Sequence, residues 1–475
     1  MFGSNGTAVE RLPTDMNRIP GGLRTDQQPP MAIPLGHFVL GLAFLVVGIG
    51  AAIAMAVTTL PGLASLAHVH VLLIGWIAIT IMGAMTQFVP VWSGVSLYSR
   101  RLAVVQLVLV AAGLIGFGAA LLAGALSVLP VAGAALLLGI WTFVYNVGRT
   151  LWRARPLDFT ERHFAVALGA FALVVPLGFL LAVDFTTPVF DATALTRGDV
   201  LLVHATLALL GAITATIVGA LAQLATMFTQ TDRTAVDERL LGLEQLTFPV
   251  GVVVLAVGRG LESLPLARVG AVAVLVGLAA FTVVVARQLL GETVDRSPMI
   301  DRYWVVVASL WAWLALTAPA WWLEPLEYGT LFGHPDGGAV LVVGVFAFVV
   351  VGSLYHIVPF IIWHERYSDR LGFEQVPMID DLYDDRLERA DFGLTAVGFL
   401  GIAAAPLFDL PEAVATAGTA LAALGLCLFV ANVLLTIHRH GPNGLAGVLT
   451  GVRESTAGAG TGGDPELDVD PAPER

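Results

Sequence analysis

Three histidines lie at the starts of long apolar segments, where they could bind a metal or a cofactor. His68 and His70 begin the stretch 68–92, and His204 begins the stretch 204–228. Neutral imidazole is a good ligand for iron and copper, and an ionisable side chain at membrane depth needs a functional reason to be there. We therefore treat these histidines as candidate ligands, with half-hydrated interfacial histidines as the alternative.

A second polar set lies near the opposite ends of these segments. Gln87 and Gln223 occupy matching positions in the two stretches, and His356 lies at the matching position of a third apolar stretch. Such a set predicts either a vestibule for protons or small ions, or hydrogen bonds between neighbouring helices, worth about 1 kcal/mol each. Both interpretations stay open.

These matches belong to a threefold internal repeat. A shift of 136 residues places His68 on His204, and a further shift of 133 residues places Gln223 on His356. Glycines align in the same frame: Gly75, Gly211 and Gly344, then Gly83, Gly219 and Gly352. The preceding segments also begin alike, with HF at His37 and His163, where the third repeat has YW at Tyr303.

The composition requires a membrane protein. Of 475 residues, 57% are hydrophobic and only 13% are charged, more apolar surface than a soluble domain uses. Because lipid leaves the backbone no outside partner, we expect an all-α polytopic fold. Twelve segments are long enough to span a membrane: 33–58, 66–92, 102–125, 128–150, 163–184, 200–228, 245–264, 268–290, 303–323, 339–363, 391–408 and 412–437.

The repeat unit is therefore four helices, and an even number of crossings keeps every copy in the same orientation. We expect a pseudo-threefold axis along the membrane normal. The transmembrane domain, residues 31–440, divides into repeats at about 31–155, 160–292 and 300–440. A polar segment, 1–30, precedes it, and the acidic tail, 441–475, is expected to be disordered.

The basic residues predict the orientation and the setting. All 24 are arginine, and only Arg197, Arg259 and Arg268 fall on the side opposite the chain termini. Both termini are therefore expected in the cytoplasm, in the cell membrane. A lysine-free chain with 36 acidic residues suggests a salt-adapted organism. No basic groove for nucleic acid is present, so the expected surroundings are membrane lipid.

The repeat pattern and two motifs resemble subunit I of the haem–copper oxidases. The stretch from His68 reads HVHVLLIGWIAITIMGAMTQFVP, and the third stretch ends in YHIVPFIIW, similar to divergent oxidase-subunit-I-like membrane proteins. The resemblance implies that His68, or His70 in its place, is an axial haem ligand, with His334 as the candidate partner. It also places His204 at the position of a copper ligand, for a copper or haem site.

The chain departs from the oxidase pattern at the copper site. The segment after His204 reads HATLA, without a carboxylate or tyrosine, and no histidine pair lies between Glu244 and Glu262. The resemblance therefore implies haem binding linked to respiratory electron transfer, with an incomplete binuclear site and partners such as small respiratory subunits or an electron donor. Two alternatives remain: a cofactor-free channel or small-solute carrier along the Gln87, Gln223 and His356 side, and a complete terminal oxidase or nitric oxide reductase.

Other polar residues have simpler expected roles. His37 and His163 are expected to anchor helix ends at the membrane surface. The acidic stretch 374–392 is expected to be a solvated loop, with calcium binding as the alternative.

Overall fold

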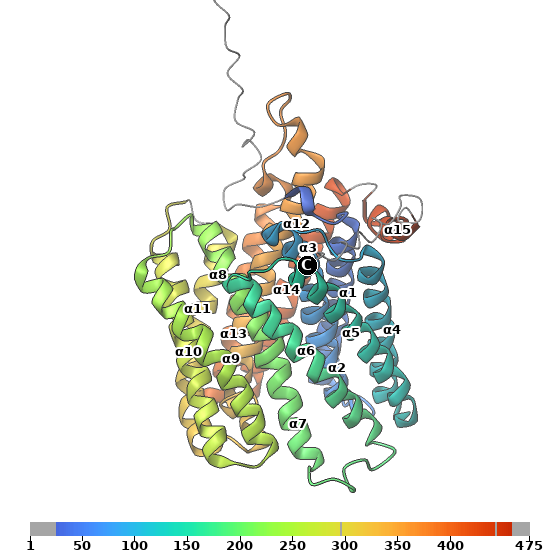
Figure 1. Ribbon diagram of the computed structural model, residues 1–475, viewed down its shortest axis with the longest axis vertical. Helices are drawn as coiled ribbons and strands as arrows, with labels where there is room; N and C mark the ends of the chain where they lie inside the picture. Colours follow the sequence, from blue (N-terminus) through green and yellow to red (C-terminus); the bar gives the residue numbers. More distant parts are fainter. Residues whose placement is uncertain (1–24, 295–296, 442–443, 458–475) are drawn as a thin grey trace, which may run out of the picture.

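The chain folds as an all-α bundle of long helices (Figure 1). The computed structural model describes residues 25–294, 297–441 and 444–457. Within them, twelve helices are long and apolar enough to cross a membrane, and no β-strand occurs. All twelve expected spans are present, as in a multi-pass membrane protein. The helices are α1 (Ala32–Val57), α2 (Ala64–His70) with α3 (Ile79–Ser93), α4 (Arg100–Ala123), α5 (Leu129–Arg153), α6 (Phe159–Val183), α7 (Arg197–Thr206) with α8 (Ala215–Thr229), α9 (Ala235–Gly260), α10 (Leu264–Leu290), α11 (Pro298–Leu323), α12 (Phe348–Arg366), α13 (Asp385–Leu407) and α14 (Glu412–His440).

Successive spans run in opposite directions, which gives the bundle two sides. We call the side where α1, α4 and α6 begin the terminus side, and the side that carries loops 58–63, 184–196 and 324–339 the far side. The terminus side is at the top of Figure 1. Side-chain caps at Ser99, Asp158, Thr234, Ser297 and Asp384 begin the spans there. They accept from main-chain N–H groups that lack a partner in the first turn.

Three spans contain a π-helical segment of eight residues each. The segments are η2 (Val71–Ala78), η4 (Leu207–Thr214) and η7 (Val340–Ala347). They join α2 to α3, join α7 to α8, and precede α12. Their starts differ by the same 136 and 133 residues as the sequence matches. The π-helix is rare and is frequently found at functional sites, so its occurrence in three spans marks them as places to look for function.

Glycines bring the last two helices of each expected repeat into close contact. A Cβ added to Gly113 of α4 would lie 2.8 Å from Leu136 N, one on Gly251 of α9 would lie 2.6 Å from Val274 N, and one on Gly398 of α13 would lie 2.3 Å from Ala422 N. Any side chain there would push the neighbouring helix backbone away. Small residues at such contacts are typical of helix pairs in membranes.

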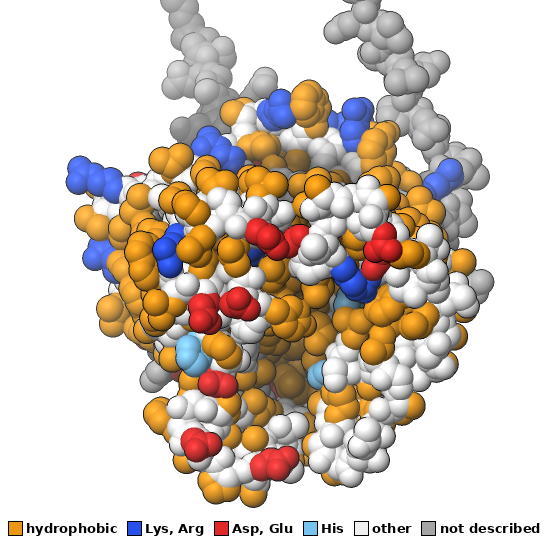
Figure 2. All heavy atoms as spheres, turned by 90° about the horizontal axis from the view of Figure 1, so that it is seen from below, with side chains coloured by type: hydrophobic (Ala, Val, Ile, Leu, Met, Phe, Trp, Pro, Cys, Tyr) orange, Lys and Arg blue, Asp and Glu red, His pale blue; other side chains and the backbone are white. Residues whose placement is uncertain are grey.

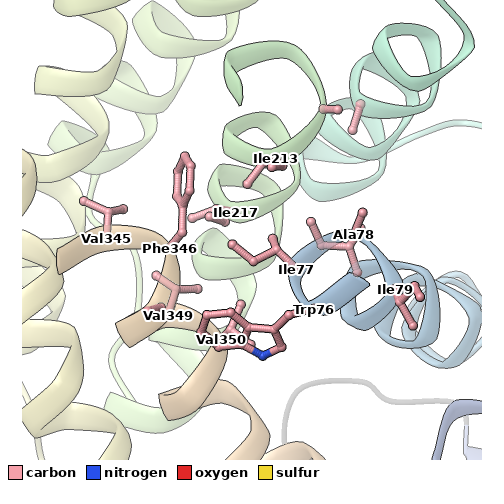
Figure 3. Close-up of a cluster of buried hydrophobic side chains, with 14 of the residues drawn as sticks. Trp76, Ile77, Ala78, Ile79, Ile213, Ile217, Val345, Phe346, Val349 and Val350 are labelled. Atoms are coloured by element: carbon pink, nitrogen blue, oxygen red, sulfur yellow. The ribbon is translucent and has the colours of Figure 1, made fainter. Parts of the chain in front are cut away.

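The centre of the bundle is closed by apolar side chains. Figure 3 shows Trp76 and Ile77 of η2, Ile213 and Ile217 from η4 and α8, and Val345, Phe346, Val349 and Val350 from η7 and α12 gathered together. All eight are buried. The three spans with π segments thus meet at a dry, packed cluster.

The C-terminal tail differs in part from its expected disorder. Residues Gly444–Ala457 form a helix, α15, which packs against α1, α4 and α14. Two buried residues, Gly447 and Val448, lie on its packed side. An apolar helical face so close to the bundle gains more by packing than by remaining solvated. Residues 1–24 and 458–475, which include most of the two predicted polar segments, lie outside the described residues.

Candidate cofactor-binding cavity

A cavity of about 930 Å³ opens between α2, α4, α5, α6 and α7 toward the far side. Figure 2, which views the bundle from the far side, shows a hollow with mainly hydrophobic side chains. Two histidines, His70 and His204, line the cavity. The other polar side chains on the wall are three hydroxyl groups near loop 58–66, those of Thr58, Thr59 and Ser65, and the phenol of Tyr328. Its size and composition are those of a site for a drug-sized or larger apolar ligand.

His70 lines this cavity with its ring held in a defined tautomer. It ends α2, where the helix continues as η2. Its Nδ1 lies 2.8 Å from the carbonyl oxygen of Leu66, and its ring packs against Phe117 with centroids 5.1 Å apart. Because a carbonyl oxygen only accepts hydrogen bonds, Nδ1 carries the hydrogen. Nε2 therefore carries the lone pair that a metal would take.

His204 is held in the same way from the opposite wall. Its Nδ1 lies 3.0 Å from the carbonyl oxygen of Val174 in α6. A Cβ on Gly178 would lie only 2.8 Å from His204 Cε1, so the ring fits because that residue is glycine. Pro176, which lies between Val174 and Gly178, has no N–H, so the carbonyl oxygen of Ala172 lacks its usual partner within the helix. Trp141 Nε1 donates to that oxygen at 3.0 Å. The wall around His204 is therefore fixed by packing and by hydrogen bonds.

The two rings form a matched pair of candidate ligands. Both line the same cavity, and within the part of the chain that the structure describes neither Nε2 has a hydrogen-bond partner. A histidine that donates Nδ1–H to a main-chain carbonyl and leaves Nε2 free is the arrangement usual for metal-binding histidines. In the described residues, no group of three or more His, Cys, Asp or Glu side chains gathers to hold a metal. The candidate ligands on the cavity wall are therefore His70 and His204.

His68 and His334, the other haem candidates, lie elsewhere. His68 is half-buried, and its Nε2 is buried without a partner in the described residues. His334 precedes the 3-10 turn η6 (Pro335–Gly337), where its Nδ1 accepts from the N–H of Asp336 at 3.2 Å. Neither residue lines the cavity. The structure therefore brings together His70 and His204, and leaves His68 and His334 apart from them.

The three members of the polar set on the terminus side have different surroundings. Gln87 is fully buried, and its Nε2 donates to Oε1 of Gln28 at 3.4 Å. His356 packs against Phe228 with ring centroids 4.6 Å apart. Gln223 lies half-buried on α8. In residues 25–294, 297–441 and 444–457, no hydrogen bond joins any two members of the set.

The structure reveals buried polar pairs that the sequence interpretation missed. His37 and His163 are 0% and 1% exposed, so their assignment as surface anchors is wrong. His37 Nε2 lies 3.4 Å from Gln106 Nε2, and His163 Nε2 lies 3.0 Å from Glu244 Oε1. In the third expected repeat, Arg302 is paired with Asp391.

The position that matches the histidines is Arg302, not Tyr303. Cβ atoms added to the aligned glycines Gly83 and Gly219 would meet the Cβ atoms of His37 and His163, and one on Gly352 would meet Cβ of Arg302. Asp391 and Glu388 belong to α13, and their side chains are buried in the bundle and paired with Arg302. This part of the acidic stretch is therefore not a solvated loop. An acid or base inside an apolar span was the signal that could have identified these pairs.

A buried arginine holds the loop that closes one side of the cavity. Arg259 is 0% exposed, and its Nη1 donates to Thr206 Oγ1 at 2.6 Å. Its Nε and Nη2 donate to the carbonyl oxygens of Pro325 and Thr330. The same loop carries the cavity residues Tyr328, Leu331 and Phe332. Arg259 therefore fixes this loop against α7, two residues from His204.

Comparison with known proteins adds no family to this description. No protein-family model matches the chain, and no curated protein matches it at a significant level.

Proposed function

We propose that the chain is a haem-binding membrane protein of the oxidase-subunit-I type, with three four-helix repeats around a pseudo-threefold axis. The single observation that carries the haem assignment is the cavity in which His70 and His204 present their free Nε2 atoms from two equivalent spans. The proposed link to respiratory electron transfer rests on the resemblance alone.

Three sets of internal matches support the pseudo-symmetry. The π segments recur at the spacing of the sequence repeat. The close glycine contacts recur in the third and fourth helices of each unit. The buried pairs recur between the first and third helices of each unit. In every copy the pair member on the third helix lies seven residues before the close-contact glycine of that helix. Each of these three unrelated features occurs once in every expected four-helix unit, which is difficult to explain without a repeated unit.

The residues of the cavity fit the chemistry of haem. Apolar walls from α5, α6 and η4 suit the faces of a macrocycle, and imidazole nitrogens suit its iron. The hydroxyls of Thr58, Thr59, Ser65 and Tyr328 on the cavity wall would be hydrogen-bond donors for the carboxylate groups of such a ligand. When bound, haem would supply one-electron redox chemistry. The chain's own contribution is to orient both imidazoles and to exclude water from the apolar part of the site.

The arginine distribution supports an orientation with the terminus side in the cytoplasm. The far side, and with it the mouth of the cavity, would then face the outside of the cell membrane. An electron donor or a small partner subunit would approach from that side, because the shortest route to the two histidines leads through the mouth of the cavity.

The experiment is a haemin titration of the detergent-purified protein, followed by the Soret band. We expect saturation at one haem per chain and a six-coordinate low-spin spectrum. His70→Ala and His204→Ala should each weaken binding and change the spin state, whereas His68→Ala and His334→Ala should behave like the native protein. Equal binding by all five proteins would contradict the assignment of the ligands.

The alternatives predict other results. A cofactor-free carrier would show no haem-dependent spectrum, and the packed apolar cluster at the centre of the spans argues against a channel along the axis. A complete oxidase needs a further copper site with three histidines, and the described residues offer no such group. The proposal therefore includes haem and leaves out a three-histidine copper centre.

A further inference from the structure

A histidine and a glutamate form an isolated buried pair on the terminus-side half of the second repeat. His163 in α6 is 1% exposed and Glu244 in α9 is 0% exposed. His163 Nδ1 lies 2.9 Å from the carbonyl oxygen of Phe159, and its Nε2 lies 3.0 Å from Glu244 Oε1. The second carboxyl oxygen, Glu244 Oε2, is buried and has no hydrogen-bond partner.

These contacts determine how many protons the pair holds. Nδ1 must carry a hydrogen, because the Phe159 carbonyl only accepts. The contact between Nε2 and Oε1 then requires one further hydrogen between them, which makes the pair neutral overall. If Glu244 were ionised, Oε2 would share a negative charge without a donor in an apolar interior. As a carboxylic acid it leaves only an uncharged carbonyl oxygen there, which costs less. The geometry therefore places the proton on Glu244.

The equivalent pairs show what is special about this one. In the first repeat His37 faces Gln106, an amide that holds no exchangeable acidic proton. In the third repeat Arg302 faces Asp391 and Glu388, and its guanidinium stays charged. The same place in the fold thus carries a neutral pair, a titratable pair and a permanent ion pair. Among the three buried pairs, the second repeat alone combines a carboxyl group with an imidazole.

Charged groups on the surrounding helices lie near the helix ends, where Arg239 of α9 is exposed and the following groups have other partners. On α6, Glu161 accepts from Ser93 and caps the helix, and Arg162 donates to Leu157 O and Gln245. On α5, Arg149 and Arg153 lie over the ring of Tyr98. On α7, Arg197 pairs with Asp184, and Asp199 is part of the capping box of the helix. On α9 and α10, Asp237 pairs with Arg287, Arg259 donates to loop 325–330, and Arg268 donates to Trp322 O. Glu238 lies near Arg233. No contact joins any of these groups to the His163–Glu244 pair in the described residues.

We propose that His163 and Glu244 form a proton-binding site inside the membrane domain. The pair holds one exchangeable proton, which leaves when the O–H bond of Glu244 breaks and passes to water at the terminus side. The pair then carries one negative charge next to a neutral imidazole, and it returns to neutrality when a proton comes back. His163 lies four residues after the start of α6, about 6 Å along the axis from that end, and the unpartnered Oε2 is an atom that water would bond on the way.

This site does not depend on a ligand in the cavity. It shares α6 with the cavity, however, because Val174 and Gly178 of the same helix position His204. A change of charge at the pair would therefore act on a helix that also shapes the cavity.

The test is infrared spectroscopy of the purified full chain in lipid, over the pH range in which it stays folded. The native protein should show the C=O stretch of a protonated carboxyl group at neutral pH. The band should shift on transfer to D2O and should disappear reversibly at alkaline pH. Glu244→Gln reproduces the His37–Gln106 pair of the first repeat, so we expect a folded protein that lacks the band.

A reciprocal variant keeps the test decisive if Glu244→Gln fails to fold. Gln106→Glu copies the second-repeat pair into the first repeat, next to His37, and should add a second exchangeable carboxyl band. The proposal is overturned if the native protein has no such band, if the band persists in folded Glu244→Gln, or if the band never exchanges with D2O in the folded protein. The last result would identify a purely structural pair.

Discussion

The close helix pairs make a sharp prediction about single methyl groups. In α13, a Cβ on Gly398 would lie 2.3 Å from Ala422 N and 2.6 Å from Gly418 O, whereas a Cβ on Gly393 would meet nothing within 4 Å. Gly398→Ala must push α13 and α14 apart, and overpacking of this kind costs about 1–3 kcal/mol. Gly393→Ala should stabilise the helix by about 0.5–1 kcal/mol, since alanine loses less backbone entropy. The two variants should therefore differ by about 1.5–4 kcal/mol in free energy of unfolding.

The other repeats provide the same comparison. Gly251→Ala should be destabilising and Gly242→Ala should not, because the first Cβ would meet Val274 N at 2.6 Å and the second meets nothing. The assay is reversible unfolding in mixed detergent micelles, followed by circular dichroism. Equal stability of Gly398→Ala and Gly393→Ala would refute the close packing of α13 on α14. A penalty in only one repeat would contradict its repetition.

Three further predictions concern the cavity and the far side. Gly178→Ala should displace the His204 ring and weaken haemin binding about 10–100-fold, whereas Gly169→Ala on the same helix, with nothing near its Cβ, should not change binding in the same titration. Arg259→Met should lower the free energy of unfolding by about 1–3 kcal/mol, because it leaves buried acceptors without a donor. It should also speed hydrogen exchange in loop 325–332. Arg268→Met is the control for both measurements. Asp184 lies outside the spans, and the hydrogen bond from Arg197 lowers its pKa below the usual range. Asp184 should therefore help to order loop 184–196 at pH values above the ordinary aspartate pKa. This contribution should disappear as the pH falls through the lowered value, and hydrogen exchange at Val189 measures it. Exchange in Asp184→Asn should lack this dependence.

The twelve spans could be predicted because they are carried by local patterns. Apolar length determines which segments can cross a bilayer, and aligned glycines such as Gly83 and Gly219 mark one helix face. The choice between His68 and His70 could not be made in this way. Two residues apart on a helix, they point about 200° away from each other, and only the packing of η2 against its neighbours decides which one reaches the cavity.

The buried pairs depend on contacts between distant parts of the chain. His163 and Glu244 are 81 residues apart, and each looks like an isolated polar residue near a helix end. Their depth in the bundle follows from the close approach of Gly219 to His163. The π segments could not be predicted from the sequence either, because an extra residue per turn has no sequence signature among Leu, Val, Ile and Ala.

The most direct test of the haem proposal is the dithionite-reduced minus oxidised visible spectrum of the native protein, purified from a salt-adapted host, together with its iron content. We predict sharp α and Soret bands, about one iron per chain, and their loss or shift in His204→Ala and His70→Ala. A flat spectrum from folded, iron-free protein would contradict the account.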